Sequence, residues 1–236
     1  MVILNTDLGF CFIKGELGKK VMKQSLSWWG DVTTDNVKET IERNKRVKSE
    51  RLIQFRIVKD ILDNAGIEYW IDYGTLLGAY RSGRILLHDN DIDFSCRKEY
   101  FEEIDKLLKK NLPSRYQYEK ISNLFGISTT KYQIFLKDGE KLYDSKNNEW
   151  YLVQHDIYFY DYDKIKKMYV MDYQGFGINE KWFPEDVIFP LGCIQFEGLM
   201  CPCPNKAQDY LEICYGYIGE DFIFDSETNL FIKKKI

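Results

Sequence analysis

Two short motifs in the first half of the chain combine residue types that could carry chemistry. Gly74 and Thr75 end one apolar run, and Asp91 and Asp93 stand two positions apart in a later one. Residues i and i+2 of a β-strand project from the same face, so the two carboxylates are expected to lie side by side. Adjacent carboxylates repel each other and are tolerated where a divalent cation lies between them. Their hard oxygen ligands predict a site for Mg²⁺ or Mn²⁺.

The Gly-Thr pair predicts a phosphate site beside this metal site. Residues 67–73 have the pattern of a buried strand, and Gly74 and Thr75 then open a short helix expected at 76–82. The first turn of a helix offers free N–H groups and the positive end of the helix dipole to an anion. A phosphate site next to paired aspartates is the minimum apparatus for metal-assisted attack at phosphorus.

Each motif taken alone has a simpler explanation. Most Asp-x-Asp sequences are solvated turns, and a Gly-Thr pair before a helix is often no more than a cap. The order of strand, Gly-Thr, helix and strand with Asp-x-Asp is much more restrictive. This order favours a phosphoryl-transfer site over two unrelated features.

The elements around the motifs alternate between helical and extended patterns. An apolar stripe ended by Ala65-Gly66 predicts a long helix at 34–64, directly before the Gly-Thr strand. In the strand that carries the aspartates, Ile92 and Phe94 are expected to point into the core. The rest of the chain predicts a helix at 98–111, β structure at 116–135 and 150–160, and a helix at 206–215.

Asp156 is the one acid inside the β-like run 150–160. An aspartate buried among Val, Ile and Phe needs a partner, because burial of an unpaired charge is costly. The alternative is a carboxylate at a strand edge that faces water. Asp161 and Asp163 are rival candidates for a functional acid, but they follow in an apparent turn.

Residues 74–81 (Gly-Thr-Leu-Leu-Gly-Ala-Tyr-Arg) and 89–93 (Asp-Asn-Asp-Ile-Asp) resemble the signature of the LicD/fukutin family, part of the nucleotidyltransferase-fold superfamily. The similarity extends over about residues 50–220. One departure is Asn90, where bacterial members usually carry aspartate, and it leaves the Asp-x-Asp pair intact. The resemblance implies an α+β, nucleotidyltransferase-like fold with a mixed β-sheet flanked by helices.

The resemblance also implies a set of site residues. In the superfamily a third carboxylate comes from a later strand beside the Asp-x-Asp strand, and Asp156 matches it. Asp91, Asp93 and Asp156 would then hold one or two divalent cations, and either Asp93 or Asp156 could act as general base. Gly74 and Thr75 would cradle a phosphate of the donor.

Other residues near the motifs have less defined roles. Arg81, on the short helix, is expected to be a further phosphate contact. Asp89 is assigned to donor binding, although the neighbouring Asn90 leaves its role open. His88 and His155 each adjoin a proposed metal ligand. The family favours neither histidine as a ligand, and we interpret His88 as local packing.

LicD-like enzymes move a phosphorylated alcohol, such as phosphocholine or ribitol phosphate, from its CDP carrier to a glycan hydroxyl and release CMP. The resemblance therefore implies a CDP-linked donor and a glycan or glycolipid acceptor. Two alternatives stay open. One is transfer of a nucleotide to a small molecule or protein, and the other is an inactive homologue that serves as a binding or scaffold module.

Composition limits the remaining function classes. The chain has 236 residues, 33 basic against 37 acidic, and 44% hydrophobic residues. This length and composition predict one globular domain over 1–236. The resemblance to the LicD/fukutin family divides it into an N-terminal extension at 1–35 and a LicD-like core at 36–220. The acidic balance argues against nucleic acid as a partner.

No run approaches the roughly 20 apolar residues of a transmembrane helix, and no signal-like segment is evident. We therefore expect a cytoplasmic protein, or a luminal Golgi protein if the chain is trimmed from a longer parent. The cysteines follow no regular framework, which favours free thiols. Cys201 and Cys203 are too close for a common zinc knuckle.

Overall fold

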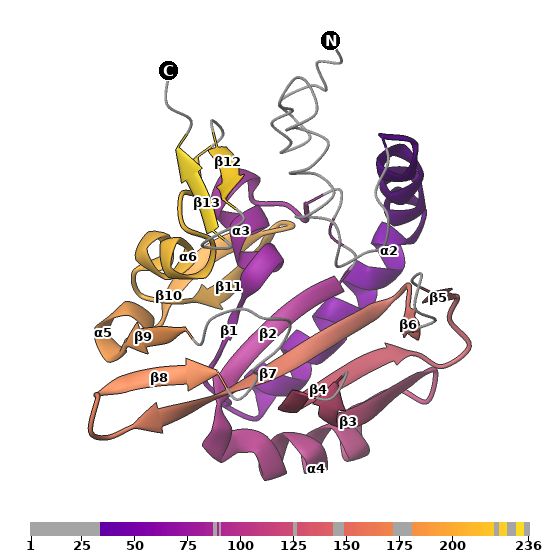
Figure 1. Ribbon diagram of the computed structural model, residues 1–236. Helices are drawn as coiled ribbons and strands as arrows, with labels where there is room; N and C mark the ends of the chain where they lie inside the picture. Colours follow the sequence, from indigo (N-terminus) through magenta and orange to yellow (C-terminus); the bar gives the residue numbers. More distant parts are fainter. Residues whose placement is uncertain are drawn as a thin grey trace.

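The computed structural model describes residues 34–86, 89, 91–124, 127–143, 149–171, 181–219, 222–225 and 230–233 (Figure 1). In chain order, the elements are α2 (Thr34–Asn64), β1 (Tyr69–Ile71), α3 (Tyr73–Ser82), β2 (Asp91–Arg97), η3 (Lys98–Tyr100), α4 (Phe101–Asn111), β3 (Tyr116–Leu124), β4 (Ile127–Leu136), β5 (Lys141–Tyr143), β6 (Glu149–Tyr151), β7 (Gln154–Asp163), β8 (Met168–Met171), β9 (Trp182–Pro184), α5 (Glu185–Ile188), β10 (Gly192–Phe196), β11 (Leu199–Cys203), α6 (Ala207–Tyr215), β12 (Phe222–Asp225) and β13 (Leu230–Lys233).

A mixed sheet forms the centre of the fold. Its strand order is β1-β2-β7-β4-β3, and β8 and β9 extend it from β7. β2 and β7 run parallel, whereas the other neighbouring strands are antiparallel. Phe55 of α2 stacks on Phe94 of β2, and Phe101 of α4 stacks on Tyr132 of β4. The mixed sheet flanked by helices confirms the α+β prediction.

Side chains alternate between the two faces of β2, as the period of a strand requires. Ile92 and Phe94 are completely buried, and Phe55 lies 5.4 Å from the Phe94 ring on the face that α2 covers. Asp91 and Asp93 therefore project from the opposite face. The predicted division of this strand into core and site residues is confirmed for its core residues.

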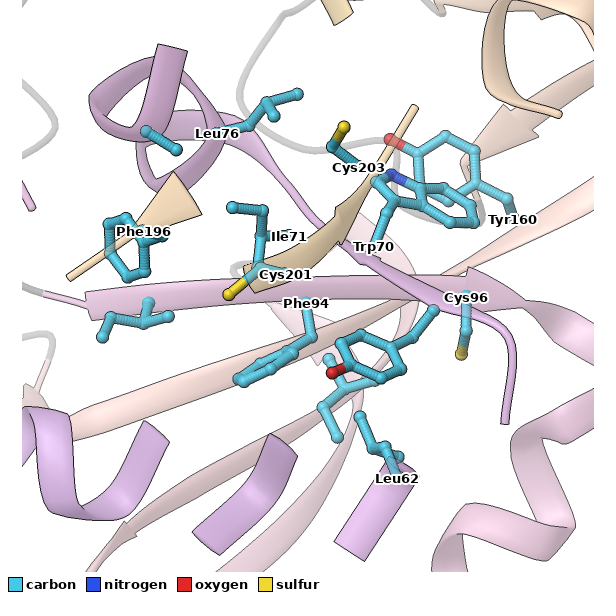
Figure 2. Packing of buried hydrophobic residues seen from close by; sticks show 14 of the residues in the cluster. Leu62, Trp70, Ile71, Leu76, Phe94, Cys96, Tyr160, Phe196, Cys201 and Cys203 are labelled. Carbon is cyan, nitrogen blue, oxygen red and sulfur yellow. The ribbon is translucent and has the colours of Figure 1, made fainter. Parts of the chain in front are cut away.

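Apolar packing continues on both sides of the strands. Figure 2 shows Leu62 and Phe94 on one side and Trp70 and Tyr160 on the other. The Trp70 and Tyr160 rings are 5.1 Å apart. Full burial of a large apolar side chain contributes about 1.5–3 kcal/mol, so this two-sided core supplies the free energy that offsets the burial of charge described below.

The strand and helix around the Gly-Thr motif begin and end at other residues than the sequence predicts. The strand expected at 67–73 is limited to β1, and α3 begins at Tyr73 instead of residue 76. The cause is Asp72, which caps the helix by accepting the Tyr73 N–H at 2.6 Å. Gly74 and Thr75 therefore lie inside the first turn of α3 and not before it.

The expected β run 150–160 also differs in detail. A bend at residues 152–153 separates β6 from β7, and β7 continues to Asp163. The extension exists because the end of β7 pairs with β8, with Asp161 opposite Val170. Asp161 and Asp163 thus lie in a strand, and the turn expected for them is wrong.

Residues 1–33, which include most of the expected N-terminal extension, lie outside the described residues, as do His88 and Asn90. None of the helices described is both long and apolar enough to cross a membrane. Cys201 and Cys203 are free thiols, and within the described residues no group of potential metal ligands includes them.

Candidate active site

Three carboxylates from two parallel strands form the centre of the candidate site. Asp93 on β2 lies directly opposite Asp156 on β7, and Asp91 lies two residues before Asp93. One ligand oxygen from each of the three side chains lies within 4.8 Å of the others. Asp93 and Asp156 are buried, with 6% and 2% of their surface exposed. The structure thus brings together the three acids that the sequence singled out.

Burial and mutual repulsion make this cluster electrostatically unfavourable by itself. Burial raises the pKa of Asp91 to about 6, and the charge of Asp156 adds to the effect. Burial also raises the pKa of Asp93 well above its usual value, reinforced by the charges of Asp91 and Asp156. A divalent cation would reverse both shifts, because a positive charge between carboxylates favours their ionised forms.

One carboxylate oxygen of Asp93 points to a missing ligand in the cluster. Its Oδ1 atom is buried and has no hydrogen-bond partner among the described residues. A buried polar atom without a partner is costly and calls for an explanation such as an ion. All ligand atoms of the cluster are carboxylate oxygens, a donor set that suits Mg²⁺ or Mn²⁺. These residues fit such a cation.

Thr75 connects the first turn of α3 to the acidic cluster. Its side chain is fully buried, and its Oγ1 accepts the Asp93 N–H at 2.9 Å. The hydroxyl is therefore a structural tie between α3 and β2. A phosphate could meet Thr75 through its main-chain N–H.

The first turn of α3 keeps part of its hydrogen-bonding capacity. The Asp72 side chain accepts the Tyr73 N–H, and the Asp72 carbonyl accepts the Leu76 N–H. The N–H groups of Gly74 and Thr75 are the remaining donors of this turn, since the first N–H groups of a helix have no partner within the helix. They give the turn the local positive charge that favours an anion.

Asp89 lies against this turn. A Cβ atom at Gly74 would stand 2.2 Å from Asp89 Oδ2, so only glycine leaves room for the carboxylate in this position. The charge of Asp89 also helps to raise the pKa of Asp93. Asp89 therefore lies against the helix terminus, and its charge acts on the acidic cluster.

Arg51 on α2 lies behind the site and was not anticipated from the sequence. It is 1% exposed and donates hydrogen bonds to the Leu152 carbonyl, at 2.7 and 3.1 Å, and to the Asp89 carbonyl, at 2.9 Å. Burial lowers its pKa to about 10, so it stays charged at neutral pH. Arg51 thereby fixes the segments that lead into β2 and β7. The signal was a charged residue within the apolar stripe of the long helix.

Lys131 on β4 was likewise missed. Its ammonium lies 2.5 Å from Asp156 Oδ2, and its side chain is almost completely buried. Tyr158 donates to the same oxygen at 3.1 Å, and Gln133 approaches Asp156 Oδ1 at 3.4 Å. Lys131 and Gln133 alternate along β4 with the buried Tyr132, and this polar alternation in an inner strand was the available signal.

The remaining candidates lie away from the cluster. Arg81 is in the last turn of α3, about 10 Å along the helix from Gly74, and donates to the Ile218 carbonyl at 2.9 Å. Asp161 pairs with the exposed Lys98 near the other end of β7.

His155 belongs to the opposite face of β7. Its ring nitrogens lie 3.3 Å from the Ile92 carbonyl and 3.1 Å from the Arg51 carbonyl. Burial lowers the pKa of His155 to about 3, so the ring is neutral at physiological pH. This histidine connects β7 to β2 and α2 and does not face the acids.

Comparison with protein families gives a match over residues 66–206 to LicD/FKTN/FKRP, nucleotidyltransferase domain. The chain belongs to this family. The matched segment contains the Gly-Thr motif, the acidic motif and Asp156, and it accounts for the nucleotidyltransferase-like fold.

Several individual proteins are similar to the chain at low identity. An uncharacterized protein of Rickettsia typhi is 29% identical over 170 residues, which cover 68% of this chain and 50% of that protein. The mouse ribitol 5-phosphate transferase FKRP is 25% identical over 175 residues, covering 68% of this chain and 30% of FKRP. The mouse ribitol-5-phosphate transferase FKTN is 23% identical over 198 residues, covering 82% and 37%. The chain spans half or less of the length of these relatives.

Proposed function

We propose that this protein is a metal-dependent phosphotransferase that moves a phosphorylated alcohol from a CDP carrier to a glycan or glycolipid hydroxyl and releases CMP. The observation that carries the proposal is the convergence of Asp91, Asp93 and Asp156 beside the first turn of α3, within a LicD-family domain. Relatives named ribitol 5-phosphate transferases support a phosphorylated alcohol, such as ribitol phosphate or phosphocholine, as the transferred group.

The three aspartates would hold Mg²⁺ or Mn²⁺, which when bound stabilises negative charge on the phosphoryl oxygens. Asp93 offers the buried Oδ1 atom described above, and Asp156 is kept in place by Lys131. Arg51 fixes the segments before both strands, so the carboxylates are positioned before a substrate arrives. Such preorganisation lowers the barrier because little reorganisation is needed during the reaction.

The first turn of α3 would bind a phosphate of the donor. Gly74 and Thr75 supply main-chain N–H groups at the positive end of the helix, close to the acids. We assign Asp89, which lies against Gly74 and whose charge acts on Asp93, to the same donor-binding region. Arg81 contributes positive charge from the other end of α3.

Calorimetric titration of CDP into the protein, with Mn²⁺ and again with EDTA, tests the proposal. We expect binding that requires the metal, followed by CMP release when a CDP-alcohol and a glycan acceptor are supplied. Release of pyrophosphate from a nucleoside triphosphate would instead favour nucleotide transfer. Absence of binding by any nucleotide would favour a binding or scaffold module.

A matched pair of variants makes the test specific to the cluster. Asp91→Asn removes one proposed ligand and is expected to abolish transfer and metal-dependent CDP binding. Asp161→Asn removes a carboxylate from the far end of β7, where it pairs with Lys98, and is expected to leave both unchanged. Retained activity in Asp91→Asn would contradict the assignment of this residue.

A further inference from the structure

A buried lysine stands beside the proposed metal ligands. Lys131 projects from β4 on the same face as Gln133, which lies opposite Asp156 in the antiparallel pair of β4 and β7. Its ammonium is 2.5 Å from Asp156 Oδ2, and the two side chains are 5% and 2% exposed. A buried ion pair is weak evidence for a stabilising role, because the desolvation of both charges offsets their attraction. The position of this cation therefore calls for a functional explanation.

The contacts of Asp156 limit what it can ligate. Its Oδ2 accepts hydrogen bonds from Lys131 and from the Tyr158 hydroxyl, at 2.5 and 3.1 Å. Its Oδ1 has only a long contact of 3.4 Å to Gln133 among the described residues. A carboxylate commonly bridges two cations with one oxygen on each. Asp156 has one oxygen taken by Lys131 and Tyr158, so it can serve one cation.

We propose that the Lys131 ammonium takes the place of a second divalent cation, so that the acidic cluster binds one divalent cation per chain. Two-cation sites of phosphoryl-transfer enzymes place their ions about 3.5–4 Å apart, with a carboxylate between them. In this protein a fixed ammonium stands on one side of that carboxylate. Lys131 acts through Asp156, which makes it a positioning residue. The inference rests on the proposed function, in which the same aspartates hold the metal.

The number of Mn²⁺ ions bound by the full chain tests this directly. Equilibrium dialysis, with free Mn²⁺ measured by electron paramagnetic resonance, is expected to give one Mn²⁺ per chain, both without nucleotide and with CDP. Two Mn²⁺ per chain would overturn the inference on Lys131 and leave the metal-dependent function intact. No bound Mn²⁺ would overturn the metal centre itself and this inference with it.

Variants at the ion pair separate charge from packing. Lys131→Met keeps the length of the side chain and removes its charge, and it is expected to raise the count to two Mn²⁺ per chain. Lys131→Arg keeps the charge, and Tyr158→Phe removes a hydrogen bond to the same oxygen without changing charge. Both controls are expected to stay at one. A count of one Mn²⁺ in folded Lys131→Met would overturn the proposal and leave Lys131 and Asp156 as a structural ion pair only. If that variant does not fold, the wild-type count decides.

Discussion

The two faces of the central strands contribute to different properties of the protein, one to its stability and the other to its candidate active site. On one face of β2 and β7, Ile92, Phe94 and Phe159 are fully buried against α2 and α4. On the other face, the same strands carry Asp93 and Asp156, which are also buried but carry carboxyl groups. The apolar face contributes to stability, whereas the acidic face costs stability until a cation binds. Consecutive residues of one strand therefore differ in what their loss should do.

The comparison also shows why the register of these strands matters. Side chains alternate with a period of two, so a slip of one residue would move every acid into the core and every core residue into the site. Arg51 and His155 bind main-chain carbonyls behind the strands. We infer that these contacts on the apolar face help to maintain the register that places the acids opposite each other on the other face.

The largest effect is expected for Asp93→Asn. Loss of this ligand should lower the transfer rate by at least about a thousandfold, equivalent to about 4 kcal/mol of transition-state stabilisation. Stability of the metal-free protein should be unchanged or higher, because a buried carboxylate is removed. Steady-state CMP release and urea unfolding measure the two effects. Loss of stability comparable to that of a core variant would contradict the separation of the faces.

Phe94→Ala, at the next position of the strand, should have the opposite effect, with a loss of stability and unchanged metal binding. Phe94 is completely buried and stacks on Phe55. Its truncation should lower the free energy of unfolding by about 3–5 kcal/mol, from lost burial and from the cavity left behind. In the fraction that stays folded, the number of bound Mn²⁺ ions should equal that of the wild type. A changed metal count with unchanged stability would contradict this assignment.

A smaller effect is expected from pH in the metal-free protein. The folded pKa of Asp91 is about 6, above its ordinary value of 3.8. Between these values the folded state binds more protons than the unfolded state, so stability falls as pH rises through this window. The loss attributable to Asp91 should be about 1–3 kcal/mol.

Thermal unfolding at pH 4.5 and pH 7, for the wild type and for Asp91→Asn, isolates this contribution from that of other acids. The variant should lose less stability as the pH rises. Adding Mn²⁺ at pH 7 should restore stability to the wild type more than to the variant. Equal pH profiles for the two proteins would contradict a raised pKa of Asp91 in the folded protein.

The smallest effect is expected at the border of the acidic face. Gly74→Ala would place a Cβ 2.2 Å from Asp89 Oδ2, so the Asp89 side chain must move away from the first turn of α3. We expect about tenfold weaker CDP binding, or 1.4 kcal/mol, with little change in stability. Gly192→Ala is the matched control, because its nearest contact would be an ordinary 3.5 Å to Cys203 Sγ. Equal CDP affinity in both variants would remove Gly74 from the donor site.

Local sequence was sufficient for some of these features. The spacing of Asp91 and Asp93 places them on one face of any strand, and the apolar residues between and after them define the core face. The helix 34–64 was predicted with its observed ends, because Gly66 has a positive φ of 68° that ends it. The start of α3 was misplaced, since the pattern of apolar residues does not show that Asp72 caps the helix.

Other features depended on which strands pair. Asp156 was selected through the resemblance to a family, and its place opposite Asp93 follows from the parallel pairing of β2 and β7. Asp161 and Asp163 have the same residue type but lie farther along β7, away from the cluster. No local pattern separates these acids, because their distances to Asp93 are decided by register.

The sequence by itself thus determined the family, the α+β class, and the residues of the two motifs with the faces that they share. The tertiary structure alone decided the surroundings of the acids: Lys131 against Asp156, Arg51 behind the strands, and the Thr75 hydroxyl on the Asp93 main chain. The physical reason is distance along the chain. A strand or helix orients neighbouring residues by its own period, whereas contacts between residues far apart in sequence exist only once sheet pairing and helix packing are complete.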